Sequence, residues 1–593
     1  MTFNEITTGV LVIGSGAAGV MAAIKAHDAG ADVLVVTKGA WGSGNTVKAL
    51  AGFAAAFGHA DPRDNPDVHF GDVVRNGVGL CNQKLVRKWV NTICGLTEEM
   101  RSWGLDLKRI GDKYSQIAWE GHTYPRMINH NRETGKYLIK CLRERASSLG
   151  IKVIEQMVIG GLLKADGEAT GAWGFNYETG ELFHFRCKTV IVCTGGFGAM
   201  YPVGDNVMQA TGEGYAQAFD AGAKMIGMEF AHFLPTPIHP EGMHTRGVFT
   251  RITNGLLSAG ARLYNGHGER FMFGYFPEQG EKGHSMEPLC RRIAQEITEG
   301  RAGLHGGIYF DLSDVPTRLR EEEQYKRLFI SADRSDIDLR RQPIELSTYP
   351  HDLVGGIRID EFGRTNVPRL FAAGEAAGGS HGASRFGGSA LSDCLVFGAA
   401  SGEAAAALAR DTNAVPPTNR AALDDVRGRL DAWSSGKGAS PAEVRDRIRD
   451  LAFRHLNMVR SGPGLEAVLQ EVKAFRRDVL PTMCTKVDGS LDFALLRQAI
   501  EAEGQVRLCE LLATAALDRK ESRGGYFGGH YRTEYEQQDD AGWLKNIVLC
   551  NDKGEIRIEY EAPVTLESLS KDAAATIATP WRARPGELVN QSE

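Results

Sequence analysis

The sequence predicts an α/β protein built on a Rossmann-like dinucleotide-binding domain. Three features near the N-terminus predict it: an apolar strand at 10–13, the spacing G-x-G-x-x-G at Gly14, Gly16 and Gly19, and a second apolar strand at 33–36 after an alanine-rich helix. Gly14 permits a tight turn from strand to helix, Gly16 lets the backbone approach a pyrophosphate, and Gly19 lets helix and strand pack closely. The phosphates are then expected at the helix N-terminus, where the helix dipole favours negative charge.

The end of the second strand bears on which dinucleotide is bound. A classical NAD site usually places an acidic residue there to hold the ribose. This chain has Thr37 and Lys38 instead, which favours FAD over NAD. The alternative is a glycine turn with a purely structural role.

Length, glycine content and charge limit the class of protein. A chain of 593 residues is too long for one hydrophobic core, so we expect two to four structural units. Glycine makes up 71 residues, about 12% against a typical ~7%, which suggests close approach of the backbone to a ligand at many places. The formal net charge is −6 and no basic stripe is present, so we expect no nucleic-acid partner.

The sequence predicts neither a membrane span nor a metal centre. No apolar run reaches the ~18–20 residues that span a bilayer, and the N-terminus lacks the basic and apolar regions of a signal peptide. The ten cysteines show no C-x-x-C spacing, so we expect buried small hydrophobes rather than metal ligands. A cytoplasmic protein without an iron–sulfur cluster of its own is therefore expected.

A run of small residues at 39–58 follows the second strand directly and contains Asn45, Thr46 and Gly52. Its backbone can lie close to a large planar ligand, whereas its apolar content argues against a flexible loop. Farther along, an apolar strand at 189–196 ends in paired glycines.

Longer stretches resemble one flavoprotein family. They are VIVCTGG at 190–196, TGEG at 211–214, MEFAHFLPT at 228–236, GHGERFM at 266–272 and LFAAGEAAGGSHGASRFGGSALSDCLVFG at 370–398. These stretches are similar to the flavoproteins of succinate dehydrogenase, fumarate reductase and L-aspartate oxidase. The resemblance covers nearly the whole chain, and the last stretch is its most specific part.

The resemblance implies a three-domain architecture. A glutathione-reductase-type, Rossmann-like FAD-binding domain would comprise 1–231 and 352–430. An inserted α+β capping domain at 232–351 would close over the flavin. A C-terminal helical domain at 431–540 and an extension at 541–593 would follow.

The resemblance also implies roles for individual residues. Glu375 would hydrogen-bond an FAD ribose, and Ser389 and Leu391 would lie by the flavin ring. Arg385 would clamp a substrate carboxylate, for which a planar guanidinium suits because it pairs bidentately. His351 would hold a substrate carboxyl group. The residues expected to hold the cofactor are Gly14, Gly16, Ala18, Gly19, Thr37, Lys38, Asn45, Thr46, Gly52, Thr194, Gly195, Glu375, Ser389 and Leu391.

Three positions depart from the family pattern. Asn45 stands where members with covalent flavin carry the linking histidine, so we expect noncovalent FAD. Leu257 stands where the family has its proton-shuttling arginine, and Leu234 replaces a histidine that binds substrate. Opposite Leu234 and Leu257, a second carboxylate would lose several kcal/mol of solvation.

These departures make fumarate and succinate unexpected substrates. A carboxylate clamp with an apolar far side suits a larger, partly apolar substrate. The proton donor could be His232, Arg251, Arg262 or His239, between which the sequence does not choose.

We therefore expect an FAD-dependent oxidoreductase that reduces or forms a carbon–carbon double bond next to a carboxylate or carbonyl of an organic acid or acyl derivative. By the resemblance, a separate iron–sulfur or ferredoxin-like subunit would exchange its electrons. Alternatives are amino-acid oxidation as in L-aspartate oxidase, sulfur chemistry as in the flavoprotein of adenylylsulfate reductase, and a flavin-binding subunit without catalysis.

Overall fold

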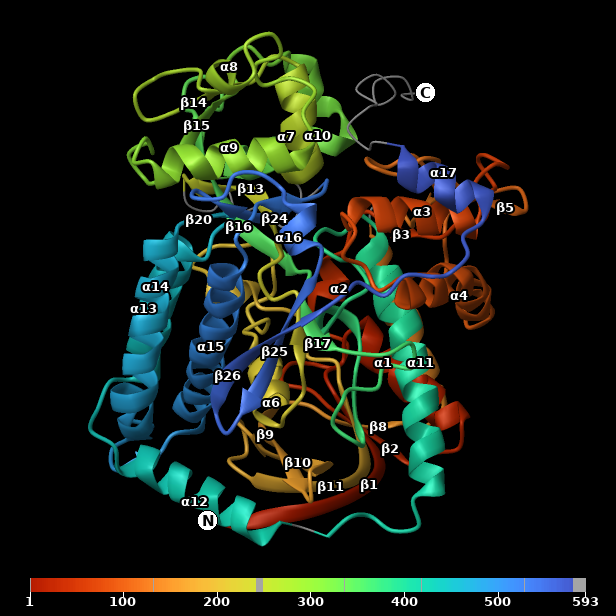
Figure 1. Cartoon of the computed structure of the whole chain (residues 1–593), viewed down its shortest axis with the longest axis vertical. Coiled ribbons are helices and arrows are strands. Elements are labelled where there is room, and N and C mark those ends of the chain that lie inside the picture. Colours follow the sequence, from red (N-terminus) through yellow and green to blue (C-terminus); the bar gives the residue numbers. More distant parts are fainter. Residues whose placement is uncertain are drawn as a thin grey trace.

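The computed structural model describes residues 2–131, 133–240, 249–334, 336–417, 419–526 and 528–579. Figure 1 shows a broad lower body, which holds both chain halves, beneath a separate helical layer formed by α7, α9 and α10. The broad body carries the N-terminal sheet at its base, with α13, α14 and α15 along one side and α1 and α11 along the other.

The central sheet has the order β8-β2-β1-β11-β10-β9, and β18 also pairs with β11. Its parallel strands are β1 (Phe3–Ile13), β2 (Val33–Val36), β8 (Lys152–Ile154), β11 (Leu182–Val192) and β18 (Leu370–Ala372). The antiparallel strands β9 (Met157–Ala165) and β10 (Glu168–Asn176) extend one edge. The predicted parallel α/β core is confirmed. Like other buried parallel strands, β2 is apolar throughout.

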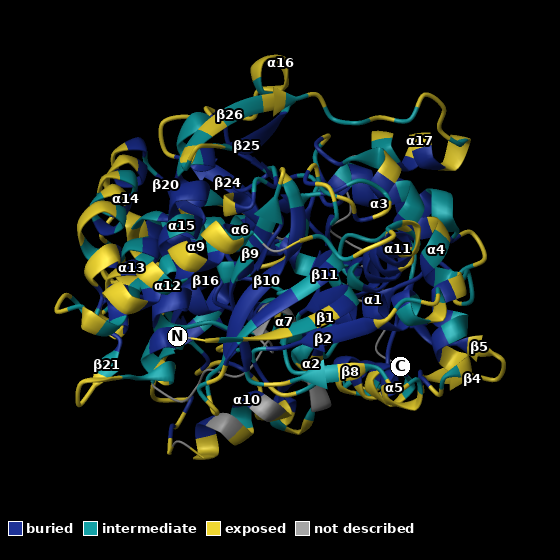
Figure 2. Cartoon of the chain, turned by 90° about the horizontal axis from the view of Figure 1, so that it is seen from below, coloured by how far each residue is buried: buried dark blue, intermediate teal, exposed yellow. Residues whose placement is uncertain are grey.

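Two helices from distant parts of the chain pack together beside this sheet. They are α1 (Ala17–Asp28), which follows the glycine turn, and α11 (Ser389–Asp411). Gly398 and Gly402 of α11 face the α1 backbone so closely that a Cβ on either would lie within 2.6 Å of a carbonyl oxygen of α1. Small residues therefore bring the two helix N-termini to the same end of the sheet. Figure 2 shows α1 within the dark blue, buried interior.

A second sheet, of order β14-β15-β16-β13-β24-β20, connects the body to the upper layer. Its long pair is β13 (Ala231–His239) with β16 (Ile344–Leu353), flanked by β14 (Arg262–Tyr264) and β15 (Ile308–Asp311) on one side and by β24 (Gly528–Arg532) and β20 (Val459–Arg460) on the other. A separate apolar core lies between residues 234 and 346, with Phe386 and Tyr526 added to it. It packs under α7 (Phe249–Ser258), α9 (Met286–Thr298) and α10 (Glu323–Arg334). This is the region of the predicted capping domain, whose boundaries stay a prediction.

The C-terminal third consists of helices followed by a strand pair. The helices are α12 (Arg420–Ser435), α13 (Pro441–His455), α14 (Gly462–Ala474) and α15 (Phe493–Asp518). Strands β25 (Asn546–Asp552) and β26 (Glu555–Glu561) then join β12 (Met225–Ile226), β17 (Gly356–Arg358) and β19 (Ala377–Gly378) in a third sheet. The final described helix, α17 (Lys571–Ala578), packs on α3 (Pro66–Asn76). The chain thus returns to its N-terminal region.

Candidate functional site

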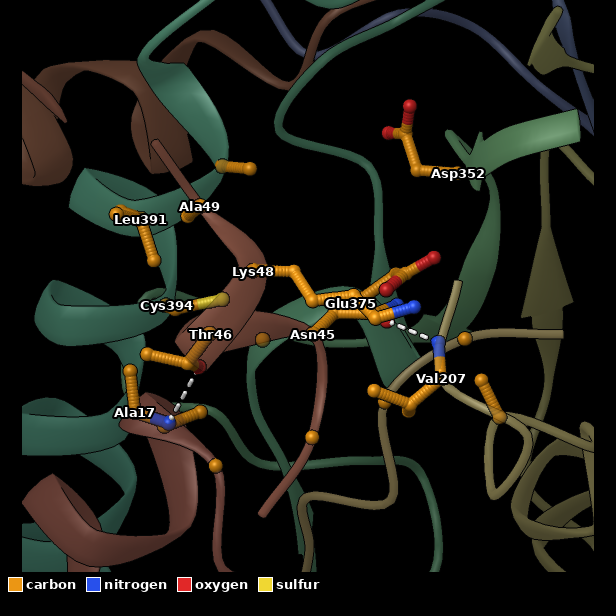
Figure 3. A pocket seen from close by; sticks show the side chains of 18 of the residues that line it. Ala17, Asn45, Thr46, Lys48, Ala49, Val207, Asp352, Glu375, Leu391 and Cys394 are labelled. Atoms are coloured by element: carbon orange, nitrogen blue, oxygen red, sulfur yellow. Dashed lines mark hydrogen bonds between the residues drawn. The ribbon is translucent and has the colours of Figure 1, made fainter. Parts of the chain in front are cut away.

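A cavity of about 870 Å³ lies between the central sheet and the β13–β16 pair. Figure 3 shows Leu391 and Cys394 of α11 on one side, α2 (Asn45–Lys48) in the middle and Asp352 on the other side. The predicted residues that line the cavity are Gly14, Gly16, Ala18, Thr37, Lys38, Asn45, Thr46, Gly52, Thr194, Gly195, Glu375, Leu391, His351 and Arg385. Distant segments therefore converge on one site, as the sequence pattern predicts.

The glycine turn has the geometry that its spacing predicts. Gly14 has φ +108°, and a Cβ there would lie 2.2 Å from the carbonyl oxygen of Cys193. A Cβ on Gly19 would lie 2.0 Å from the carbonyl oxygen of Gly14, so only glycine allows this contact between helix and strand. Gly19 does not line the cavity but packs beneath it. The backbone N–H of Ala17, at the start of α1, donates to Thr46 Oγ1 at 3.0 Å (Figure 3).

Several buried polar atoms at this end have no partner among the described residues. They are Thr194 Oγ1, Glu375 Oε1 and Ser389 Oγ. Thr194 and Glu375 line the cavity, whereas Ser389 is the first residue of α11 and lies just outside the lining. Burial raises the pKa of the Glu375 carboxyl to about 7. A buried polar atom without a partner is costly, and the hydroxyl groups and phosphates of a dinucleotide would satisfy such atoms. The residues present therefore fit FAD.

Lys38 is already bonded within the protein. Its Nζ donates to Glu213 Oε1 at 2.5 Å, Thr211 Oγ1 at 2.6 Å and Glu501 Oε1 at 3.2 Å. Burial lowers the pKa of Lys38, but the two carboxylates more than offset this and raise it above its ordinary value. Lys38 therefore fastens the end of β2 to α6 (Glu213–Asp220) and α15 while it lines the cavity.

Helix α2 fixes the loop at 205–207. Asn45 Oδ1 accepts from the Val207 backbone N–H at 2.9 Å, and Asn45 Nδ2 donates to Asn206 Oδ1 at 2.5 Å. Lys48 Nζ donates to the carbonyl oxygens of Asp205 at 2.9 Å and Asn206 at 2.7 Å. Figure 3 shows these side chains together beside Glu375. The Asn45 amide thus has a structural role in holding this loop.

Arg385 is buried and paired with a carboxylate of its own chain. Its Nε donates to Asp352 Oδ2 at 2.8 Å and its Nη2 to Asp352 Oδ1 at 3.1 Å. His232 completes the cluster: its Nδ1 lies 2.7 Å from Asp352 Oδ1, and its Nε2 accepts from the Arg385 backbone N–H at 2.8 Å. Burial alone would raise the pKa of Asp352, but Arg385 and His232 hold it well below its ordinary value. The expected carboxylate clamp therefore already carries a counter-charge.

His351 forms a second charged pair. Its Nδ1 lies 2.6 Å from Asp205 Oδ2, and both residues line the cavity. Burial lowers the pKa of the imidazole, but the Asp205 carboxylate outweighs burial and raises it to about 9. His351 is therefore an imidazolium at neutral pH.

A β-bulge turns His351 towards the cavity. His232 lies opposite Asp352 in the β13–β16 register, while the next residue, Phe233, lies opposite Pro350. His351 is thus the extra residue on β16. A bulge re-aims side chains, which explains how the consecutive residues His351 and Asp352 both line one cavity.

The two leucines that replace polar family residues lie in different places. Leu234 lines the cavity and is buried. Leu257 lies on α7 within the apolar core of the upper layer and does not line the cavity. One apolar substitution therefore shapes the site directly, and the other removes a polar residue from the layer above it.

Most of the proposed alternative proton donors lie elsewhere. Arg262, on β14, forms an ion pair with Asp314 and does not line the cavity. His239 stacks on His305 at a ring separation of 3.5 Å, also outside the cavity. Arg251 belongs to α7, but its side chain lies outside the described part of the structure. His232 is 1% exposed and both its ring nitrogens have partners in the Arg385 cluster.

Sequence reasoning missed several residues of the substrate end. Asp352 and Asp205 supply its two carboxylates, and Trp119, Glu120 and His381 also line it. Asp352 follows His351 directly, which was a usable signal. Asp205 lies 146 residues from its partner, and no local pattern marks it.

Two scans of the described residues concern metals and membranes. They contain no group of three or more His, Cys, Asp or Glu side chains that could hold a metal ion. Within the same residues, α11 alone is long and apolar enough to cross a membrane, but 78% of its apolar window is buried inside the fold. We therefore describe α11 as a core helix.

Comparison with known proteins gives matches along almost the whole chain. An FAD binding domain model matches residues 9–391, and a fumarate reductase flavoprotein C-terminal model matches residues 445–581. The flavin-family subunit of fumarate reductase (CoM/CoB) from Methanothermobacter marburgensis is 36% identical over 91% of this chain and 96% of that protein. A succinate dehydrogenase flavoprotein subunit from Coxiella burnetii is 28% identical over 91% of this chain and 94% of its own length. The structure of Mycobacterium smegmatis Sdh1 in complex with UQ1 superimposes with a TM-score of 0.87 at 29% identity, covering 96% of each chain.

Proposed function

Because the chain belongs to the FAD-dependent oxidoreductase family of succinate dehydrogenase, fumarate reductase and L-aspartate oxidase, we propose that it reduces or forms a carbon–carbon double bond beside a carbonyl or carboxylate. Its substrate is an organic acid or acyl derivative other than fumarate or succinate. FAD, when bound, supplies the acceptance or donation of the hydride. The chain supplies binding, orientation and proton transfer.

One observation carries the substrate proposal: Arg385 is neutralised by Asp352 while Leu234 lines the same cavity. A dicarboxylate brings two negative charges, and each needs its own counter-charge once water is excluded. Here Arg385 has an internal counter-ion and the far side is apolar. The remaining N–H groups of Arg385 could still orient one carbonyl or carboxylate.

The residues of the site divide the work. Thr194 and Glu375 would hold the sugar portion of FAD, and the N-terminus of α11 would face its ring. Arg385 and His351 would orient the polar end of the substrate, and Leu234 would contact its apolar end and exclude water.

FAD is proposed to bind without a covalent bond. Asn45 stands at the expected linking position, and its amide is committed to Asn206 and Val207. An amide of this kind is not a nucleophile that could bond to the flavin. Acid precipitation should leave the yellow colour in the supernatant, and flavin fluorescence that stays with the denatured chain on a gel would contradict this.

An iron–sulfur or ferredoxin-like subunit is the proposed electron partner, and the cytoplasm the proposed location. The support is that relatives are named as subunits and that the sequence has no C-x-x-C. The FAD-loaded protein should co-purify from its native source with a partner of this kind. Behaviour as a lone homo-oligomer that reacts fully with oxygen or NAD(P)H would contradict the proposal.

Dye-linked assays test the substrate class. The FAD-loaded protein is supplied with reduced viologen and a panel of unsaturated monocarboxylic acids, acyl thioesters and fumarate. We expect turnover with a member of the first two groups. In the Arg385→Lys variant, kcat/KM should fall with normal FAD content, because lysine lacks the bidentate fork. Unchanged kinetics would remove Arg385 from the site.

Fumarate reduction is the second candidate. The 36% identity to a protein named as part of a fumarate reductase (CoM/CoB) favours it. The fumarate arm of the same assay separates the two candidates, since only this one predicts fumarate as the best acceptor.

A further inference from the structure

The cavity contains a proton donor candidate that the arginine pattern of the sequence does not suggest. His351 lies at the β-bulge of β16, and its side chain is 38% exposed, unlike the 1% of His232. Nδ1 is held by Asp205 Oδ2 at 2.6 Å, whereas Nε2 has no hydrogen-bond partner among the residues that the structure describes. One nitrogen is therefore anchored and the other remains available to a ligand.

The pair is held from several directions. Asn206 Nδ2 donates to the carbonyl oxygen of His351 at 2.9 Å, so the loop that bears Asp205 also grips the backbone of its partner. Asn45 and Lys48 of α2 fasten the same loop from the cofactor side. The orientation of the imidazole is therefore set by groups that line both ends of the cavity.

The charges around His351 favour its protonated form. Asp205 and Asp352 act to raise its pKa, and Arg385 acts to lower it. Glu375 and His232 also face this cluster. The net result is an imidazolium with a pKa of about 9, which can give up a proton far more readily than an arginine.

We propose that the Nε2–H of His351 is the proton donor of the reaction, with Asp205 as the residue that positions and charges it. In the reducing direction, the carbon β to the carbonyl accepts a hydride from reduced FAD, and the electron pair of the double bond moves to the α carbon. The Nε2–H bond breaks as the α C–H bond forms, which leaves a neutral imidazole. Solvent then returns the proton; the dehydrogenation runs in reverse. This proposal rests on the proposed function.

The first test measures the imidazole itself, without any substrate. The protein is labelled with ¹³Cε1-histidine, and the His351 resonance is identified by its loss in His351→Gln. We expect titration near the pKa of about 9 in the native protein and a clear downward shift in Asp205→Asn. Titration at or below the ordinary value of ~6.5 would overturn the proposal, whether or not a substrate is known.

The second test uses the substrate found in the dye-linked assay. In the reducing direction, kcat of the native protein should fall as pH rises through the pKa of His351, and Asp205→Asn should move this fall to lower pH. His351→Gln should lower kcat by about 10²–10⁴-fold with normal FAD content. His239→Gln, a histidine outside the cavity, is the matched control and should leave kcat unchanged.

The outcomes separate the two proposals. If the native protein turns over no unsaturated acid or acyl thioester, the proposed function fails, and the titration still decides on the His351–Asp205 pair. If the native protein turns over and His351→Gln retains its rate and pH profile, His351 is not the donor. Loss of rate in both histidine variants would also count against His351.

Discussion

The two ends of the cavity differ in how their polar groups are satisfied. At the cofactor end, Thr194 Oγ1 and Glu375 Oε1 are buried without a partner among the described residues. At the substrate end, Arg385 is paired with Asp352, and His351 with Asp205. The cofactor end is thus incomplete without a ligand of defined shape, whereas the substrate end balances its own charge.

The difference shows what each end can select. Buried atoms without partners favour a ligand that supplies their hydrogen bonds, which gives specificity for one cofactor. Internal ion pairs reduce the gain from binding a charged substrate, and a neutral or singly charged one then competes better. The comparison predicts strong dependence of the first end on its glycines and of the second on its pairs.

The largest expected effect concerns the glycine turn. Gly19→Ala would place a Cβ 2.0 Å from the Gly14 carbonyl oxygen, and backbone cannot yield cheaply. We expect a loss of about 1–3 kcal/mol or more and little bound FAD, measured by denaturant unfolding and by flavin absorbance. Gly95→Ala on α4 (Gln83–Ser102) is the matched control, because its Cβ would meet nothing within 4 Å. Equal FAD content in the two variants would contradict the account of the turn.

The second prediction tests the pair at the substrate end. Arg385 is 7% exposed and Asp352 is 8% exposed, so Asp352→Leu leaves a buried guanidinium without its counter-ion. We expect a loss of about 3–5 kcal/mol in the free energy of unfolding. The double variant Asp352→Leu/Arg385→Met should recover most of it but lack activity. A single variant as stable as the native protein would show that the pair is not maintained in solution.

The sequence predicts the cofactor end well because its signals are local. The glycines, both strands and the helix lie within one short stretch, and Glu375 is marked by a family motif. The substrate end depends on contacts between distant segments. Arg385 meets Asp352 across 33 residues and His351 meets Asp205 across 146, and both depend on a β-bulge that no residue pattern marks. Leu257 was expected at the site, but the structure places it in the core of the upper layer.

The third prediction concerns that leucine. Leu257 is 1% exposed, so Leu257→Arg would place a charge in an apolar core. We expect a destabilised protein without gain of fumarate reduction, measured by thermal unfolding and the viologen assay. Leu257→Met, which keeps the apolar character and approximate volume, should cost less than about 1.5 kcal/mol. An Arg variant that is stable and reduces fumarate would contradict this placement.

The smallest expected effect is a pH dependence at the cofactor end. Burial raises the pKa of Glu375 to about 7, so the FAD-free protein holds this proton between the ordinary value near 4.5 and pH 7. Its stability should therefore fall as pH rises through that window. Glu375→Gln removes the dependence, so the FAD-free variant should melt higher than the native protein at pH 8 and bind FAD more weakly. A variant that melts lower at pH 8 and keeps full FAD affinity would contradict the assignment.

The comparison between the two ends is tested most directly by anaerobic stopped-flow reoxidation. The FAD-loaded protein is photoreduced and mixed with fumarate or with an α,β-unsaturated monoacyl thioester, while recovery of the flavin absorbance is followed. The account predicts recovery with the thioester at least about 10²-fold faster than with fumarate, since only the monoacyl compound suits a self-neutralised site with Leu234 opposite. Reoxidation by fumarate at ordinary enzyme rates, ~1–10³ per second, and faster than by any monoacyl compound, would contradict it.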